Sequence, residues 1–470
     1  LCEGSVQEVM DLTAVAHLAT LKTCVPFINF FDGFRTSHEY HKIEVMDMED
    51  IRPLVDEADV KRFRDRALTP ERPVTRGTAE NPETFFTHRE ACNPYYDRVP
   101  EVVENYLAEI SKITGREYHL FSYYGAEDAD RMIILMGSAT EAAREAIDHL
   151  NANGEKVGMI SVHLYRPFSV KHLLASVPKT VKKIAVLDRT KEPGSIGDPL
   201  YLDVVAALAQ EGRNIKVIGG RYGLASRDTQ PKHIKSVYDF MASEKAHTDF
   251  TVGINDDVTF KSIEVDDNYH IKGDYTSCLF WGLGSDGTVS ANKNSIKIIG
   301  DHTDKYVQAY FQYDSKKSGG VTRSHLRFGP KPVNAPYLVS TADFVSCSLE
   351  SYVGKYDMLA ALKDGGTFLL NTVHSKKEIE EHLPNSFKKQ LAEKHAKFYI
   401  IAANAAAREC GFRPGLGVNT IMQSAFFKLN EQIMDYEEAK QHMKEFATKT
   451  YAKKGQDIVD QNHKAIDMGA

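Results

Sequence analysis

The sequence predicts an α/β protein with several parallel or mixed sheets and flanking helices. Short apolar runs alternate with amphipathic helical patterns, and glycine-rich turns follow several of the runs. Such alternation is typical of βα units, whose strands lie parallel in a sheet. A chain of 470 residues is also too long for one hydrophobic core, and its length corresponds to about three domains.

The first expected domain segment is residues 1–115. Residues 6–18 carry apolar side chains at helical spacing with no start signal before them, so we expect the chain to begin inside a helix and inside a domain. A strand at residues 25–31 then leads into the polar loop 32–39. A Pro- and Arg-rich stretch follows, and its aromatic residues indicate an ordered connection.

The second expected domain is residues 116–272, where strands and helices alternate most clearly. The expected strands are 131–136, 156–164, 183–187 and 215–218, with a helix at 141–151. This order predicts a parallel sheet.

The third expected domain is residues 273–470, which follow a polar and poorly periodic boundary stretch at 242–275. Its expected strands are 277–281, 306–313, 344–347, 366–370 and 397–402, with helical patterns between most of them.

Composition excludes several classes of protein. The net charge of -7 argues against a nucleic-acid-binding surface over the whole protein, so an anionic ligand must be met by a local site. No apolar run approaches the roughly 20 residues of a membrane span. Six scattered cysteines form no CxxC pair and no short Cys/His spacing, which indicates reduced thiols, a cytoplasmic protein and no metal site. An organellar targeting segment before residue 1 stays open.

The sharpest local motif is the GxGxxG loop of residues 282–287, between a predicted strand and a helix that begins near Thr288. Glycines permit a tight turn and close backbone approach, while the amides and the positive end of the helix dipole suit an anion such as a diphosphate. A GxGxxG loop alone is a weak signal, because a tight structural turn has the same pattern.

Two further loops support a ligand site at this end of the sheet. Asp314, Lys316 and Lys317 follow the next strand and should open at the same edge, where the lysines suit the phosphate of NADP or coenzyme A. A solvated surface pair is the alternative for the lysines. Asn419 follows a glycine-rich turn and either caps the helix 420–429 or binds a polar group of the ligand.

The polar loop of the first segment offers acid–base and anion-binding side chains in Asp32, Arg35, His38 and Glu39. No metal spacing or nucleophile–base pair can be assigned to them, and a hydrogen-bonded structural loop explains them equally well. No GxSxG, HExxH, Walker or kinase motif is present.

Several long strings resemble the pyruvate:ferredoxin/flavodoxin oxidoreductase family and together cover essentially the whole chain. They are FFDGFRTSHE (30–39), RGTAENP (76–82), VLDRTKEPGSIGDPLYLDV (186–204), GGRYGL (219–224), FTVGINDDVT (250–259), FWGLGSDGTVSANKNSIKIIGD (280–301), DSKKSGGVTRSHLRFGPKP (314–332) and GKYDMLAALKDGGTFLLNT (354–372).

This resemblance implies a reaction. Pyruvate is decarboxylated on thiamine diphosphate, electrons pass through [4Fe-4S] clusters to ferredoxin or flavodoxin, and the acetyl group leaves on coenzyme A, with Mg2+ beside the thiamine. It also implies that residues 1–115 are the end of the thiamine pyrimidine domain plus a connection, that 116–272 resemble a transketolase carboxy-terminal domain, and that 273–470 bind coenzyme A. The complete enzyme is expected to be a homodimer.

The family's coenzyme A residues, matched position by position, imply one site. Its members are Gly284, Ser285, Asp286, Gly287, Thr288, Lys316, Asn419 and Asn462. The family's catalytic residues and metal ligands fall outside this sequence, so none is assigned here and the chain alone is expected to be inactive. Two alternatives stay open: a pyruvate:NADP oxidoreductase with a fused flavin reductase, and a non-catalytic nucleotide-binding or assembly subunit.

Overall fold

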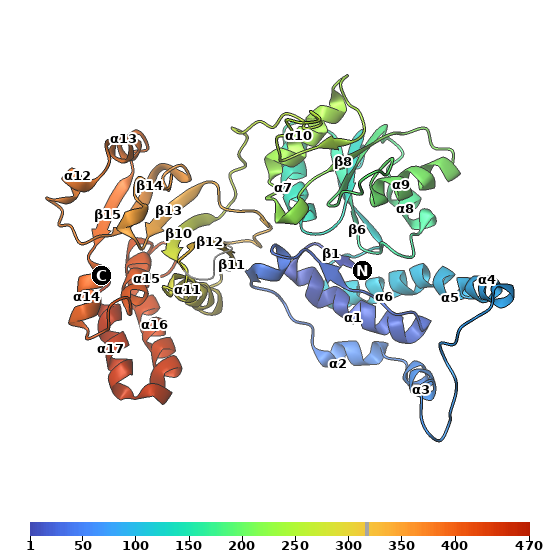
Figure 1. Ribbon diagram of the computed structural model, residues 1–470, viewed down its shortest axis with the longest axis horizontal. Helices are drawn as coiled ribbons and strands as arrows, with labels where there is room; N and C mark the ends of the chain where they lie inside the picture. The colour runs from blue at the N-terminus through green and yellow to red at the C-terminus, as the bar shows by residue number, and fades with distance from the viewer. Residues whose placement is uncertain (315–318) are drawn as a thin grey trace. The chain divides into compact units, whose positions relative to one another are not determined.

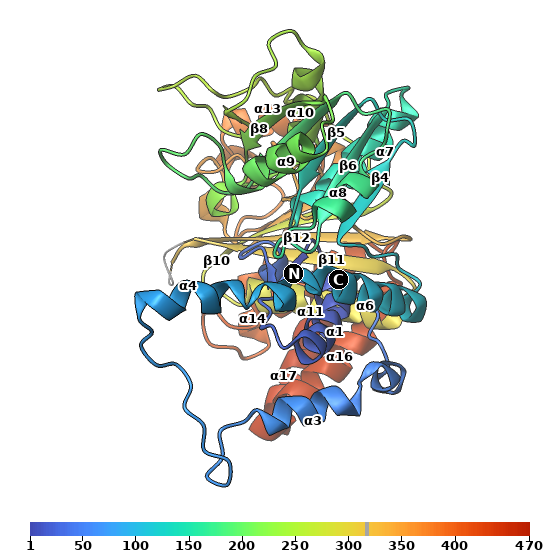
Figure 2. The same cartoon turned by 90° about the vertical axis from the view of Figure 1, so that its right-hand side faces the viewer.

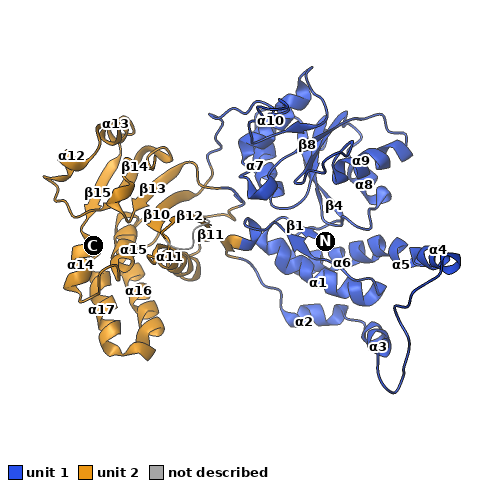
Figure 3. Cartoon of the chain, viewed as in Figure 1, with its two compact units in different colours: residues 1–37, 43–272, 334–337 blue, residues 38–42, 273–333, 338–470 orange. Residues whose placement is uncertain are grey.

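The computed structural model describes residues 1–314 and 319–470, and these form two compact units (Figure 1, Figure 3). The first unit consists of residues 1–37, 43–272 and 334–337, and the second of 38–42, 273–333 and 338–470. The main body of the second unit begins at Gly273. The expected division of the first unit after residue 115 stays a prediction.

The first unit contains a six-stranded sheet in the order β4-β6-β5-β7-β8-β9, in which the β4–β6 pair is antiparallel and the others are parallel. Its elements are β1 (Cys2–Glu3), α1 (Val6–Thr23), β2 (Phe30–Phe31), α2 (Met48–Ile51), α3 (Glu57–Asp65), α4 (Pro82–Glu90), α5 (Asn93–Asp97), α6 (Val99–Thr114), β4 (Phe121–Gly125), β5 (Arg131–Leu135), α7 (Ala139–Ala152), β6 (Val157–Val162), α8 (Val170–Ser176), β7 (Lys183–Asp188), α9 (Pro199–Gln210), β8 (Lys216–Arg221), α10 (Pro231–Ala242) and β9 (Phe250–Thr251).

Helices cover both faces of this sheet, because successive side chains of each buried strand point to opposite faces. Ile134 of β5 belongs to a core with α6, α8 and α9, whereas its neighbour Ile133 belongs to a core with α7 and α10. Strands buried on both faces are the pattern of a largely parallel sheet. A long irregular connection joins α3 to α4 within the Pro- and Arg-rich stretch (Figure 2).

The start of the chain differs from the prediction. α1 begins at Val6 and has a cap, because the Ser5 hydroxyl accepts a hydrogen bond from the Glu8 backbone N–H at 3.1 Å. The Glu8 carboxylate in turn accepts from the Gly4 N–H at 2.6 Å. The expectation that the chain starts inside a helix was therefore wrong, since Ser5 and Glu8 form a Ser-x-x-Glu helix-start pattern.

The second unit is built on a seven-stranded mixed sheet in the order β15-β14-β13-β10-β12-β11-β3. Its elements are β3 (Glu39–His41), β10 (Thr276–Leu283), α11 (Thr288–His302), β11 (Tyr306–Tyr313), β12 (Val321–Gly329), β13 (Ala342–Cys347), β14 (Leu362–Asn371), α12 (Ile379–His382), α13 (Asn385–Glu393), β15 (Lys397–Ile401), α14 (Ala403–Glu409), α15 (Val418–Leu429), α16 (Tyr436–Tyr451) and α17 (Gln456–Asp467). All five predicted strands are present.

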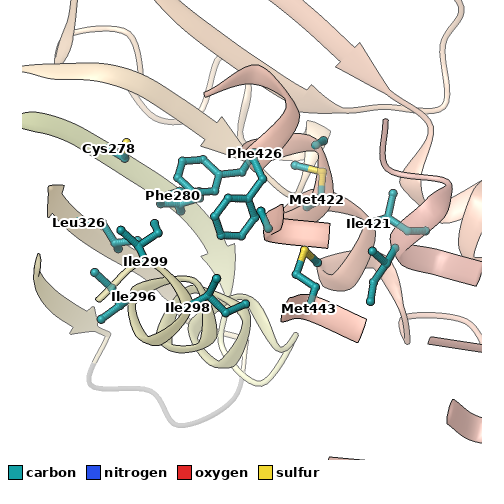
Figure 4. Packing of buried hydrophobic residues seen from close by; sticks show 14 of the residues in the cluster. Cys278, Phe280, Ile296, Ile298, Ile299, Leu326, Ile421, Met422, Phe426 and Met443 are labelled. Carbon is teal, nitrogen blue, oxygen red and sulfur yellow. The ribbon is translucent and has the colours of Figure 1, made fainter. Parts of the chain in front are cut away.

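The two faces of this sheet bury different cores. Phe280 packs toward α11 and α15, where its ring centroid lies 5.2 Å from that of Phe426 (Figure 4). The next residue, Trp281, belongs to the core on the opposite face with α13. The protein is therefore α/β with mixed sheets and flanking helices, which confirms the predicted fold class.

Two further observations concern the whole described chain. None of its helices combines the length and the apolar composition that crossing a membrane requires. All six cysteines are free.

Candidate functional site

The glycine-rich loop lies at the carboxyl end of β10, where the sheet changes direction. β10 pairs with β13 in parallel on one side and with β12 in antiparallel on the other. β11 also pairs antiparallel with β12, so β10 and β11 run the same way. Asp314, which follows β11, therefore opens at the same edge as the loop, as predicted.

The turn from β10 into α11 depends on left-handed backbone conformations. Ser285 has φ of 72° and Gly287 has φ of 93°, and Gly287 is the N-cap of α11. Glycine adopts such angles without the steric cost of a Cβ atom. α11 begins at Thr288, as the sequence predicted.

The Asp286 carboxylate organises this turn. It accepts hydrogen bonds from the Leu283 N–H at 2.9 Å and from the Thr288 N–H at 2.7 Å, and the Thr288 hydroxyl lies 2.9 Å from Oδ2. A carboxylate at a helix N-terminus satisfies a free amide and interacts favourably with the helix dipole. Asp286 therefore acts on the loop itself, and its negative charge has to be offset wherever an anionic ligand binds nearby.

Asn419 lies across the loop on α15 and connects the two segments. Its Nδ2 donates a short hydrogen bond to the backbone oxygen of Asp286, and its Oδ1 lies 2.9 Å from the Thr288 hydroxyl. Gly417 is the N-cap of α15, and Asn419 is inside the first turn. Of the two roles that the sequence left open for Asn419, helix capping is therefore wrong, since its side chain reaches another element instead.

Two cavities of about 320 Å³ each flank the loop and share Leu283 and Asp286. The first is lined by Leu283, Gly284, Ser285, Asp286, Gly287, Val289, Ser290, Tyr313, Asp314, Gly320 and Thr322. The second is lined by Leu283, Asp286, Ser348, Leu349, Glu350, Ser351, Asn371, Thr372, Val373, Asn404, Gly415, Val418 and Asn419.

Part of the helix N-terminus remains available in the first cavity. Among the described residues, the backbone amides of Gly287, Val289 and Ser290 have no acceptor. The first amides of a helix point out of its N-terminus and carry partial positive charge, so they suit the oxygens of a phosphate.

Lys316 and Asn462 are the remaining two predicted site residues. Lys316 lies outside the described residues, but Asp314 and Gly320 on either side of it in the sequence both line the first cavity. Asn462 is buried in α17, where its Nδ2 donates to the Ile458 oxygen at 2.8 Å. It lines neither of the two cavities.

The polar side chains of the second cavity, among them Ser348, Asn371 and Thr372, were not predicted from the sequence. Ser348 follows β13, Asn371 ends β14 and Thr372 follows it, and both strands are parallel to β10. The Asn371 side chain is held in place because it donates to the Ser348 oxygen at 2.9 Å and accepts from the Ala403 N–H at 3.1 Å. The rule that ligands meet the carboxyl ends of parallel strands would have found these residues.

Cys347 ends β13 near this edge but is not a nucleophile at neutral pH. Burial raises the pKa of its thiol to about 12, although a hydrogen bond with the Leu349 backbone opposes this shift. Because the thiolate is the reactive form, Cys347 is a packing residue.

The described side chains do not assemble a metal site. Within residues 1–314 and 319–470, no group of three or more His, Cys, Asp or Glu side chains converges as a metal site would require. These residues therefore do not fit Mg2+ or an iron–sulfur cluster.

Three family models match the chain in order. Residues 1–108 match the thiamine diphosphate-binding model of pyruvate flavodoxin/ferredoxin oxidoreductase, residues 129–234 match core domain II of pyruvate:ferredoxin oxidoreductase, and residues 277–470 match the pyruvate ferredoxin/flavodoxin oxidoreductase model.

Individual relatives match over the whole chain. The pyruvate-flavodoxin oxidoreductases of Enterobacter agglomerans and Klebsiella pneumoniae are 56% and 52% identical, and each alignment covers 100% of this chain and 40% of the relative. The pyruvate:ferredoxin oxidoreductase of Moorella thermoacetica is 53% identical over 99% of this chain and 40% of its own length. The chain thus spans about 40% of the length of these curated relatives. It belongs to the pyruvate:ferredoxin (flavodoxin) oxidoreductase family.

Proposed function

We propose that this chain works within an enzyme that oxidises pyruvate to acetyl-CoA and CO2 and passes the electrons to ferredoxin or flavodoxin. The succession of three family models along the chain carries this proposal. The names of its relatives, which include both a pyruvate-flavodoxin and a pyruvate:ferredoxin oxidoreductase, support the substrate and the electron acceptors.

The second unit supplies the coenzyme A site in this proposal. Gly284, Ser285, Gly287 and Thr288 form the turn, and the first cavity provides the space. The amides of Gly287, Val289 and Ser290, which have no acceptor among the described residues, donate to phosphate oxygens in this proposal. Asp286 and Asn419 act by holding that turn in shape, because their polar groups are used by hydrogen bonds within the protein.

Lys316 supplies positive charge in this site. The ligand carries several negative charges and the loop contains the Asp286 carboxylate, so a nearby cation is required. Asn462 belongs to the proposed site through the family resemblance alone.

The complete enzyme uses thiamine diphosphate, Mg2+ and [4Fe-4S] clusters and is a cytoplasmic homodimer in this proposal. The thiamine diphosphate-binding model over residues 1–108 supports the first of these cofactors. When bound, thiamine diphosphate supplies the carbanion chemistry of decarboxylation. The residues of the second unit then bind and orient the thiol acceptor of the acetyl group.

Coenzyme A titration tests the site. A charge-assisted hydrogen bond is worth about 1.5–3 kcal/mol, so Lys316→Ala should weaken coenzyme A binding about ten- to a hundredfold by calorimetry. Gly287→Val should weaken it at least as much, because the branched side chain would hold the phosphates away from the amides. Lys376→Ala is the control, since it removes the same charge from residue 376, which lines neither cavity. Unchanged affinity in both site variants, or tighter binding of NADP than of coenzyme A, would contradict the assignment.

Turnover measurements on the complete enzyme test the proposed oxidation of pyruvate. The complete enzyme should reduce a viologen dye with pyruvate and coenzyme A, and the two site variants should retain pyruvate decarboxylation because coenzyme A enters after that step. A polypeptide of residues 1–470 alone should not reduce the dye. Dye reduction by that polypeptide would show that the redox centres had been assigned to the wrong part of the protein.

A further inference from the structure

The six-stranded sheet of the first unit has its own topological switch point. β5 comes before β6 and β7 in the chain and lies between them, pairing in parallel with both. Doubly wound sheets bind ligands in the crevice outside the carboxyl ends of two such strands. In this unit the switch point lies where β5 leads into α7 and where β7 ends at Asp188.

A carboxylate of the protein occupies this position. Asp32 Oδ2 accepts hydrogen bonds from the Ser138 backbone N–H and the Ser138 hydroxyl, both at 2.7 Å, at the N-terminus of α7. The Arg189 guanidinium, which follows β7, forms a short ion pair with the same oxygen. The Arg189 Nε also donates to the Gly223 oxygen at 2.9 Å, which fixes the guanidinium after β8.

The backbone at the switch point lies close to this carboxylate. Gly137, directly before Ser138, has φ of 80°, and a Cβ atom there would lie 2.7 Å from Asp32 Oδ2. A helix N-terminus, a hydroxyl and a guanidinium that converge on one oxygen are the elements of an anion site. The side chains of Asp32 and Arg189 are 20% and 16% exposed, so solvent screens the pair only in part.

The rest of the loop is attached to the same edge of the sheet. The Arg35 guanidinium lies 3.0 Å from Asp228 Oδ1 and donates to the Ser226 oxygen at 2.6 Å. The Ser226 hydroxyl donates to the Gly33 oxygen at 2.8 Å. Ser226 has φ of 60°, a conformation that is unfavourable for serine and that these contacts help to hold.

We infer that the first unit retains an anion-binding site for a small carboxylate or phosphate at its switch point, and that Asp32 fills this site permanently. The loop of residues 32–35 thereby locks the amino-terminal segment onto the sheet. The switch point of this sheet serves to attach the amino-terminal segment. An external phosphorylated ligand would have to displace Asp32 and therefore does not bind to the native protein.

The test is chemical rescue of Asp32→Ala in the full chain. Without the carboxylate, the melting temperature of the first unit should fall by about 5 °C. Sodium formate should restore it with a saturating concentration dependence, whereas sodium chloride at equal ionic strength should not. Inorganic phosphate as a second probe separates a site for small carboxylates from one that also takes phosphate.

Two variants distinguish binding in the site from a general effect of salt. Asp32→Asn fills the same space with an amide, so formate should cause no saturable response. Asp32→Ala/Arg189→Gln lacks the cation and should bind formate about tenfold more weakly. If Asp32→Ala does not fold, Asp32→Ser keeps an acceptor for the Ser138 N–H and undergoes the same titration. The inference is wrong if the melting temperature of Asp32→Ala responds alike to formate and chloride, or if formate raises the melting temperature of the wild type as much as that of Asp32→Ala.

Discussion

A substitution at Gly287 should affect both the stability of the second unit and its affinity for coenzyme A, and the two effects can be measured separately. Its φ of 93° lies in the left-handed region, where an L side chain costs about 1–2 kcal/mol. A Cβ atom would also lie 3.2 Å from Asn419 Nδ2, which is closer than most van der Waals contacts. Gly287→Ala should therefore lower the free energy of unfolding of the second unit by about 1–2 kcal/mol.

Coenzyme A binding should fall for a different reason. The added methyl group presses on the Asn419 amide, which holds the loop by donating to the Asp286 backbone oxygen. If the loop shifts so that one amide–phosphate hydrogen bond is lost, the cost is about 1.4 kcal/mol, or a tenfold weaker affinity.

Gly365→Ala is the matched control for this prediction. Gly365 is in the same unit with φ of 70°, and a Cβ atom added to it would meet no other atom within 4 Å. Urea unfolding should give similar losses of stability for both variants, while calorimetric titration with coenzyme A should detect weaker binding only for Gly287→Ala. Equal affinities in the two variants would refute the role assigned to the Gly287 turn.

Three further predictions concern stability and the loop. Phe426→Ala should lower the free energy of unfolding by about 3–5 kcal/mol, because Phe426 is 1% exposed, whereas Phe446→Ala, at a position 40% exposed, should cost much less in the same urea experiment. Burial lowers the pKa of His233 from 6.5 to about 4, so its contribution to stability is present above pH 6.5 and is lost as the pH falls toward 4. Unfolding curves recorded across this pH range should show that His233→Gln removes about 3 kcal/mol of the pH dependence of the free energy of unfolding. Asn419→Asp should weaken coenzyme A binding in calorimetry, because it replaces the donor to the Asp286 oxygen by a second carboxylate.

Most strands were predictable because their apolar runs are short and buried, but β12 was not. Thr322, Ser324, His325 and Arg327 of this strand are all buried although they are polar or charged. Two of them have tertiary partners: the His325 ring accepts the Val339 N–H at 3.0 Å, and Arg327 donates to the Gln308 side chain at 3.1 Å. Hydrophobic periodicity cannot identify a strand that buries polar side chains.

The part of the candidate site that depends on local backbone conformation could be predicted from the sequence. The turn at Gly287 and the start of α11 follow from local backbone requirements that glycine spacing records. The role of Asn419 does not, because its partners Asp286 and Thr288 are more than 130 residues away in the chain. A local pattern favours helix capping for an asparagine in this place, and the packing of α15 beside the loop overrides it.

Both sheets place a carboxylate at the N-terminus of the helix that follows their first central strand, with opposite consequences for ligands. In the second unit Asp286 belongs to the loop itself, takes the Thr288 amide and leaves the later amides facing a cavity of about 320 Å³. In the first unit Asp32 comes from a segment 106 residues away and meets both Ser138 and Arg189, so that the strongest anion-binding groups are already used. Strand order alone would assign a ligand crevice to each sheet. The origin of the carboxylate therefore decides which crevice remains available, and it favours the second unit as the part of the chain that binds coenzyme A.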